Sequence, residues 1–476
     1  MAIGWKLVGD NGPLPVGSVV RPEERLSWPK TIGIGAQHVV AMFGATFVFP
    51  IIMGLDANLA IMMSGVCTIL FLLIVKNKVP SYLGTSASFV GAVVAIRASG
   101  GTSASVTGAI LVAGVTLAVV GLIVHFVGGA AIRKILPPVV SGAVVMLIGF
   151  NLAPVVAGTY WPQDPGVALL TMIFTIVAAV AFRGFFSRIA VFLALIFGYV
   201  LSWVLDKTAG MITSPDGAGV VSEHYRVNLS GVADAAWFGL PTFHAPEFQV
   251  SFILLALPGV IALIAENTGH VRAVAEMTGD DLDPYMGRAL FGDGLGTALA
   301  SAVGGSPTTT YAENIGVMAA TRVYSTAAYY VAAIVAILLG LVPKFGAIVN
   351  ATPGGVLGGI TVVLYGMIGL LGAKIWIENR VDFANPVNLV PIAAGIIIGV
   401  GSVAMPFGDS FQLTGIAFGS IVAIVAFHVA RLLAPANLRE PLDGGRSYSG
   451  GTAISTGSVV EDGRSTSPFE DPRSER

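Results

Sequence analysis

The sequence predicts an all-α protein that crosses a membrane many times. Of its 476 residues, 55% are hydrophobic and only 11% are charged, whereas soluble domains carry about 25% charged residues. Apolar windows of about 19 residues, the length a helix needs to cross a bilayer, recur along the chain. Two carboxylates, Glu266 and Glu313, lie in this apolar surrounding. Because a charge at membrane depth is costly, the pair indicates a polar pathway.

Fourteen windows are candidate spans. The clearer ones begin near Thr31, Leu59, Ser105, Lys134, Val167, Ile189, Gln249, Tyr324, Thr352, Asn385 and Phe411. Three weaker ones, near Ser81, Arg288 and Ser306, are short or broken by Gly, Pro, Ser and Thr. Interrupted spans at matching places in two halves are typical of a binding site made by discontinuous helices. We therefore expect short extended stretches to break the third and tenth spans.

The distribution of lysine and arginine predicts the orientation. With the N-terminus in the cytoplasm, 21 of the 25 basic residues fall on the cytoplasmic side; the others are Arg97, Lys207, Arg226 and Lys344. This asymmetry favours an even number of spans in the cytoplasmic membrane, with both termini inside. A missed or extra pair of spans would leave this orientation unchanged.

The segments outside the spans are polar. Residues 1–30 are not a signal peptide, and residues 434–476 are rich in Ser, Gly and charge, so we expect them to be disordered. The extracellular loop 207–248 carries Trp237, Phe238 and Phe243, which are suited to an aromatic anchor at the membrane interface.

An internal repeat is indicated by two similar span openings. Both 137–142 and 353–358 start with Pro and reach Gly five positions later, and both spans end in Ile-Gly, at 148–149 and 368–369. Seven spans per half would insert the second half upside down. A binding site near the bilayer midplane would then lie at the repeat interface.

The segment 304–311, Gly-Gly-Ser-Pro-Thr-Thr-Thr-Tyr, is unsuited to a regular transmembrane helix. We expect an extended stretch, followed by a helix that opens near Glu313-Asn314. The N–H groups at a helix start can bind carbonyl oxygens, and a nearby carboxylate accepts N–H groups. Together they match the edge of a cyclic imide or amide. In the third span, 85–88 can act in the same way.

Several motifs resemble those of the nucleobase–ascorbate transporter family, also called nucleobase:cation symporter-2. Glu313-Asn314-x-Gly-x-x-x-x-Thr-Arg looks like its signature, and Gln37-His38, Tyr82-Leu83-Gly84 and Ala265-Glu266-x-x-Gly-His are similar too. The similarity runs over about 31–433. It is strongest to bacterial uracil permeases, because xanthine and urate members usually carry Gln at the first signature position.

The resemblance implies a 7+7 inverted repeat with a core and a gate domain. Residues 31–132 (spans 1–4) and 249–350 (spans 8–11) would form the core domain, and 133–206 (spans 5–7) and 351–433 (spans 12–14) the gate domain. It also implies a homodimer formed through the gate domains. No cofactor is implied beyond a proton gradient as the driving force.

The resemblance also assigns roles to residues. Those expected at the substrate are Glu266, Glu313, Ala87, Ala312, His270, Tyr311 and Ser86. Glu266 and His270, one helical turn apart, are expected to share the coupled proton. Supporting positions are Asn314, His38, Gln37 and Tyr365.

Three departures from the uracil permease pattern concern the pocket. This chain has Ala87 where the permease has Phe, Ala312 where it has Gly, and Asn267 where it has His. The first change enlarges the expected pocket, and the second tightens it near the ligand. Exclusive selectivity for uracil is therefore open.

Simpler roles compete with these assignments. Glu313 could serve the first turn of its helix, and His270, Tyr311 and Tyr365 could be interior packing residues. Asp293, near the start of the ninth span, is expected to be a helix cap.

The sequence favours a proton-coupled uracil symporter that works by alternating access. A purine or xanthine permease on the same scaffold is the alternative, and an anion transporter of related fold is disfavoured because two acids at the site would repel an anion. We find no motif of an enzyme, of a nucleic-acid-binding protein, of a metal site or of a channel filter.

Overall fold

The computed structural model describes residues 4–9, 18–129, 134–217, 219–406 and 412–439. The described part is mostly helical, with four short two-stranded sheets. From residue 440 onward, the segment predicted to be disordered lies outside the described residues.

The first half contains the helices that correspond to the first seven predicted spans. Its elements are β1 (Lys6–Leu7), β2 (Glu24–Arg25), α1 (Trp28–Ala41), η1 (Gly44–Val48), α2 (Phe49–Met53), α3 (Ala57–Ile74), β3 (Leu83–Thr85), η2 (Ala87–Phe89), α4 (Val90–Ala98), α5 (Ser103–Val127), α7 (Pro138–Phe150), α8 (Ala153–Val155), η3 (Val156–Tyr160), η4 (Trp161–Gln163), α9 (Pro165–Ala181), α10 (Phe185–Arg188) and α11 (Ala190–Thr208).

The second half begins with the long connecting segment. Its elements are β4 (Ile212–Pro215), β5 (Val221–His224), α12 (Ser230–Asp234), α13 (Val250–Ala256), α14 (Gly259–Thr278), η5 (Asp283–Tyr285), α15 (Met286–Ala302), β6 (Thr308–Thr310), α16 (Ala312–Thr321), α17 (Thr326–Gly340), α18 (Pro343–Asn350), α19 (Gly354–Glu378), α20 (Pro386–Val400), β7 (Met405–Pro406), β8 (Gln412–Leu413), α21 (Gly415–Leu433) and η6 (Ala436–Leu438).

Every predicted window contains a helix, but not every helix is long enough to span a bilayer alone. Among the described residues, seven helical segments are long and apolar enough, or up to nine if each of two bent pairs forms one span. The short ones include α4, α16 and α20. The chain is thus a multi-pass membrane protein, and the number fourteen stays a prediction.

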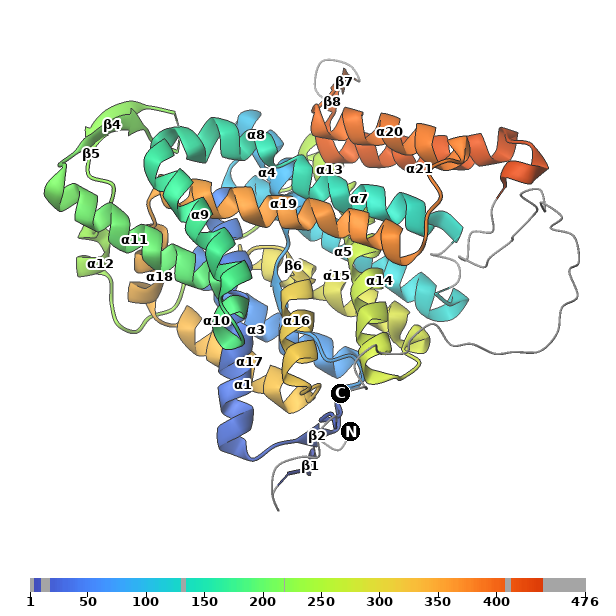
Figure 1. Cartoon of the computed structure of the whole chain (residues 1–476), viewed down its shortest axis with the longest axis horizontal. Helices are drawn as coiled ribbons and strands as arrows, with labels where there is room; N and C mark the ends of the chain where they lie inside the picture. Colours follow the sequence, from blue (N-terminus) through green and yellow to red (C-terminus); the bar gives the residue numbers. More distant parts are fainter. Residues whose placement is uncertain (1–3, 10–17, 130–133, 218, 407–411, 440–476) are drawn as a thin grey trace, which may run out of the picture.

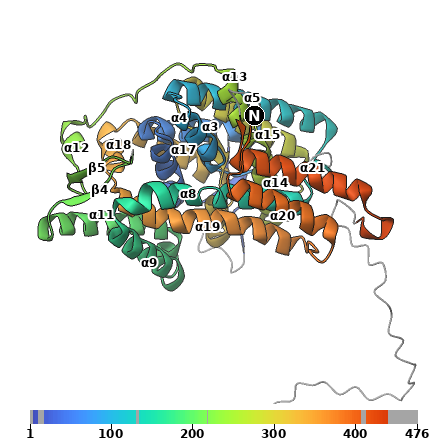
Figure 2. The same ribbon diagram turned by 90° about the horizontal axis from the view of Figure 1, so that it is seen from above.

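The helices pack as two groups on opposite sides of the molecule. Figure 1 labels the helices, and the view in Figure 2 separates them: α9, α11, α19 and α20 lie along one side, and α3, α5, α15 and α17 along the other. Within the groups, α5 packs along α15, α3 along α17, and α7 along α19. The groups contain the helices assigned above to the gate and core domains, respectively. That domain division itself stays a prediction.

The interrupted segments meet between the two halves of the sequence. Strand β3 pairs antiparallel with β6, with Leu83 opposite Thr310 and Thr85 opposite Thr308. A bilayer offers no water to unpaired backbone groups, so such short strands need partners within the protein. Threonines supply further ones: Thr68 Oγ1 accepts from Leu83 N–H at 2.9 Å, and Thr297 donates to Thr308 O at 2.7 Å. The extended stretches predicted from Gly, Pro, Ser and Thr are therefore present.

Helices α7 and α19 approach closely at glycines. Both begin after a proline, at Pro137 and Pro353. A Cβ on Gly142 would lie 2.8 Å from the carbonyl oxygen of Gly372, and a Cβ on Gly149 would lie 2.7 Å from Cα of Gly369. No side chain fits at such distances from a backbone, so glycine is required there. The two similar span openings thus belong to helices that pack on each other, although the repeat itself is still a prediction.

The N-terminal segment folds back onto the helix that follows the signature motif. Val20 pairs with Val323, and the Trp5 indole donates to Thr326 Oγ1 at 2.8 Å. The described part of residues 1–30 therefore packs against the end of α16 and the start of α17.

An arginine clip joins the long connecting segment to α9 and α11. Arg226 bonds Asp164 at 2.7 Å and Asp206 at 3.2 Å. All three side chains are at most 12% exposed. The aromatic residues of this segment remain exposed, Trp237 and Phe238 at 75%.

Candidate functional site

Glu266 lies on helix α14. The helix follows a short break at Leu257-Pro258 after α13. The Glu266 side chain is half-buried and accepts a bond from the Ser88 hydroxyl at 3.4 Å. Ser88 belongs to the turn that follows β3, so the first predicted acid faces the third predicted span.

His270 lies one turn further along α14 and is buried. Its Nδ1 bonds the Thr310 hydroxyl of β6 at 2.8 Å. Among the described residues, no ion pair or hydrogen bond joins His270 to Glu266. The two side chains predicted to share a proton are thus neighbours that face different partners.

The second acid opens helix α16. Tyr311 precedes the helix with extended dihedral angles, and Ala312 and Glu313 form its first turn. The first N–H groups of a helix have no intrahelical acceptor. Ala312 and Glu313 are both half-buried, so this helix start is accessible. The predicted extended segment and helix start are both present.

The structure brings the predicted acids together. Glu313 and Asp293 both lie close enough to Glu266 to interact with it electrostatically. Tyr311 lies near Glu266, Glu313 and Tyr365. Ser86 and Ala87 are buried directly after β3. Residues from α14, α16, α19 and the β3 turn therefore surround one place.

Asp293 was wrongly predicted to be a helix cap. It lies in the interior of α15, is fully buried, and accepts a 2.6 Å bond from Asn267 Nδ2. Asn267 Oδ1 in turn accepts from the Thr310 hydroxyl at 2.9 Å. Thr310 also bonds His270. A network of hydrogen bonds therefore links Asp293 through Asn267 to Thr310 of strand β6 and to His270. The prediction placed Asp293 near the start of the ninth span, whereas helix α15 already begins at Met286 and packs Asp293 against α14.

A repeated tetrad marks the two acids. Glu266-Asn267-Thr268-Gly269 and Glu313-Asn314-Ile315-Gly316 share the pattern Glu-Asn-x-Gly. In both, the asparagine bonds a buried partner, and the glycine, one turn beyond the acid, has nothing within 4 Å of a built Cβ. Open space therefore adjoins each acid on its helix. This duplication is a sequence signal that would have identified Asn267.

The supporting residues form a second buried cluster. His38 Nδ1 bonds Asn314 Oδ1 at 2.6 Å, and its ring packs on Tyr329 with 4.4 Å between centroids. His38 thus holds the first turn of α16 against α1. Gln37 Nε2 and the Tyr365 hydroxyl are buried without a protein partner among the described residues.

These features define a class of protein. Interrupted, apolar helices that surround acids, exposed helix starts and open space describe a multi-pass membrane permease. The chain matches the model of the permease family named Xan_ur_permease over residues 29–408. It belongs to this family, the nucleobase–ascorbate transporters.

Relatives of known name support the membership. The chain is 44% identical over 414 residues to the putative pyrimidine permease RutG of Escherichia coli, with 86% of this chain and 91% of the relative covered. It is 36% identical to the uracil permease of Bacillus caldolyticus, covering 85% and 92%. With the uracil permease of Escherichia coli it shares 35% identity, covering 84% and 91%. The relatives are permeases, so this chain is a transporter and not an enzyme.

Solved structures of more distant proteins share the fold. The transmembrane domain of the cyanobacterial bicarbonate transporter BicA aligns with a TM-score of 0.57 at 16% identity, covering 84% of this chain and 96% of that domain. The murine anion transporter Slc26a9 in its inward-facing state aligns with a TM-score of 0.59 at 13% identity, covering 86% and 70%. At such identities the likeness concerns the fold alone.

Proposed function

We propose that this protein imports uracil or a closely related pyrimidine base together with protons. The observation that carries the proposal is the convergence of Glu266, Glu313 and the first turn of α16 at one place. Relatives named as uracil and pyrimidine permeases support the substrate class.

The chemistry of the site matches the edge of a pyrimidine base. Uracil presents alternating N–H donors and carbonyl acceptors. The carboxylates of Glu266 and Glu313 accept the N–H groups, and backbone N–H groups at Ala312 and after Ser86 bind the carbonyl oxygens. Hydrogen bonds that involve a charged group are about twice as strong as neutral ones. Carboxylates at the site therefore favour a base that presents two N–H donors.

Proton coupling is assigned to the network on α14. Glu266 carries the proton. His270, one helical turn away and bonded to Thr310 of β6, stabilises either the protonated or the ionised state of Glu266. Asp293 belongs to this network through Asn267 and Thr310. A buried carboxyl group favours its neutral form. When base binding closes the site to water, Glu266 therefore retains its proton, and it releases the proton when the site opens again.

Movement of the core group against the gate group supplies alternating access. In this scheme the chain has fourteen spans in a 7+7 inverted repeat, both termini are cytoplasmic, and two copies associate through their gate domains. Site residues on α14 and α16 then move past Tyr365 on α19. Two groups of packed helices, with the acids on one and Tyr365 on the other, support this scheme.

The test is uptake of radiolabelled uracil into proteoliposomes, with and without an inward proton gradient. Unlabelled uracil, thymine and xanthine serve as competitors. Gradient-driven accumulation that uracil blocks and xanthine does not supports the proposal. If xanthine alone competes, Ala87 and Ala312 have shaped the pocket for a purine, and if uracil equilibrates without accumulation, proton coupling is refuted.

A further inference from the structure

A cavity lies where the ends of α3 and α5 meet the start of α15. Its volume is about 430 Å³, within the range of ligand pockets, roughly 300–1,000 Å³. The lining residues are Leu73, Ile74, Leu122, His125, Gly287, Arg288 and Phe291. None of them belongs to the site described above.

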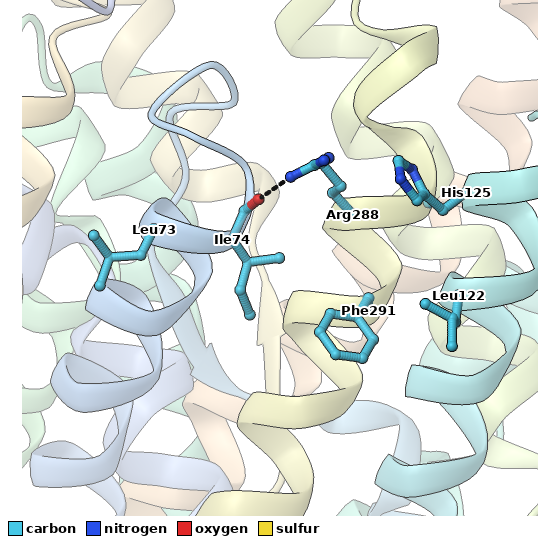
Figure 3. A pocket seen from close by; sticks show the side chains of 7 residues that line it. Leu73, Ile74, Leu122, His125, Arg288 and Phe291 are labelled. Atoms are coloured by element: carbon cyan, nitrogen blue, oxygen red, sulfur yellow. Dashed lines mark hydrogen bonds between the residues drawn. The ribbon is translucent and has the colours of Figure 1, made fainter. Parts of the chain in front are cut away.

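This cavity has a polar end and an apolar end. Figure 3 shows Arg288 and His125 at the end near the turn after α3, with Phe291 and Leu122 further along the helices. The lining surface is predominantly apolar. A molecule with a charged head and a hydrocarbon tail matches this division.

Arg288 has donors to offer at the polar end. Its Nη1 donates one bond, to the Ile74 carbonyl at a long 3.4 Å. A guanidinium has five N–H donors, and Arg288 pairs with no carboxylate among the residues that the structure describes. An arginine in this state suits a phosphate group, which it binds with two parallel hydrogen bonds.

The cavity opens on a surface that faces lipid. The outer face of α5 exposes an apolar stripe at helical spacing, Val115, Val119, Leu122 and Phe126, at 46–79%. In Figure 2, α5 runs along the outer edge of the molecule. Just beyond the polar end, Lys76 and Lys78 are exposed after α3. By the distribution of basic residues, this end is expected to face the cytoplasm.

We propose that this cavity binds one anionic phospholipid of the cytoplasmic leaflet. Its phosphate contacts Arg288, with Lys76 and Lys78 adding positive potential and the His125 ring offering a hydrogen bond. One acyl chain lies between Leu122 and Phe291, inside the cavity. The charge favours an anionic headgroup over a zwitterionic one, because each basic residue near a membrane surface strengthens binding of anionic lipid by about fivefold.

The experiment is native mass spectrometry of the full-length protein with added phosphatidylglycerol or phosphatidylcholine of the same acyl chains. We expect one phosphatidylglycerol to be retained preferentially. Arg288→Gln should reduce this retention by about fivefold, whereas Arg183→Gln, at an exposed arginine outside the cavity, should leave it unchanged. Equal retention of both lipids, or equal retention by the two variants, would overturn the proposal.

A second pair of variants tests the apolar end. Leu122→Gln places an amide in the acyl path, while Val119→Gln places one on the same helix face outside the cavity. We expect only the Leu122 variant to lose lipid. This pair also decides the matter if Arg288→Gln fails to fold after losing its bond to Ile74; lipid retention by Leu122→Gln equal to that of Val119→Gln then counts against the site.

Discussion

Asn267 Nδ2 donates to Asp293 Oδ2 across 2.6 Å, and this bond fastens the helix that carries Glu266 to its neighbour α15. Both side chains are fully buried. Asp293 Oδ1 has no hydrogen-bond partner among the described residues. Burying a carboxylate with only one hydrogen-bonded oxygen is costly. The bond from Asn267 therefore stabilises the helix packing and also connects Asp293 to the network that is proposed to handle the proton.

Asp293→Ala removes the acceptor from Asn267. We expect a loss of about 1–3 kcal/mol in the free energy of unfolding, since a buried donor is left poorly satisfied. Thermal unfolding of the purified protein measures it. Glu276→Ala, at an exposed carboxylate on the helix that carries Asn267, is the control and should be nearly neutral. Equal melting temperatures for the two variants would contradict the role of this bond.

Glu266→Gln keeps the shape of the side chain and removes its charge. We expect gradient-driven uracil accumulation to fall by roughly tenfold or more, because a hydrogen bond to a charged group contributes about 1.5–3 kcal/mol. Glu276→Gln, on the exposed face of the same helix, should transport like the wild type. Normal accumulation by the Glu266 variant would exclude this residue from substrate and proton binding.

Two buried tyrosines differ in one respect. The Tyr311 hydroxyl donates to the carbonyl oxygen of Thr85, whereas the buried Tyr329 hydroxyl has no partner among the described residues. Tyr311→Phe should therefore reduce stability by about 0.5–1.5 kcal/mol, and Tyr329→Phe should be neutral or stabilising. Chemical unfolding of both variants tests this, and the reverse order of stability would refute the assignment.

Gly149→Ala tests the contact between α7 and α19. The new methyl group would meet the backbone of Gly369, which cannot move aside as a flexible side chain can. We expect a loss of about 1–3 kcal/mol, the usual effect of overpacking. Gly158→Ala introduces the same methyl group where nothing lies within 4 Å. A melting temperature unchanged in both variants would mean that the helices separate readily.

Arg226→Ala leaves Asp164 and Asp206 without their shared cation. Because these side chains are largely buried, we expect destabilisation toward the ~3–5 kcal/mol seen when a buried pair loses one partner. Lys207→Ala, nearby and exposed, is the control. Thermal unfolding at low and high salt measures both; a loss that disappears in high salt would indicate a merely superficial pair.

Local sequence predicted much of this structure because few backbone conformations satisfy their hydrogen bonds inside a bilayer. Apolar windows had to be helices, and the Gly-Ser-Pro-Thr segment could not be one, so the break at β6 and the helix start at Glu313 were foreseeable. Glu266 and Glu313 were noticed because they lie in apolar stretches, and the family signature then favoured a substrate role for Glu313 over a role at the helix start. Each of these inferences depends on composition within about one turn or one span.

The remainder depends on contacts between distant positions. Nothing near Thr68 or Thr297 in sequence indicates that their hydroxyls complete the strand edges at Leu83 and Thr308. Asp293 was misplaced for the same reason, since its partner is on another helix. The lipid cavity combines three helices and was not predicted at all.

Synthesis of the chain gives the pairing of β3 with β6 a temporal meaning. Tyr311 and Thr85 are 226 positions apart, which corresponds to roughly 11–45 s at translation rates of about 5–20 residues per second. During that interval the first strand sits in the membrane without its partner, and its backbone needs temporary protection from lipid. Until β6 has been synthesised, the backbone N–H and C=O groups of β3 must therefore be satisfied by other hydrogen-bond partners, such as water or the insertion machinery.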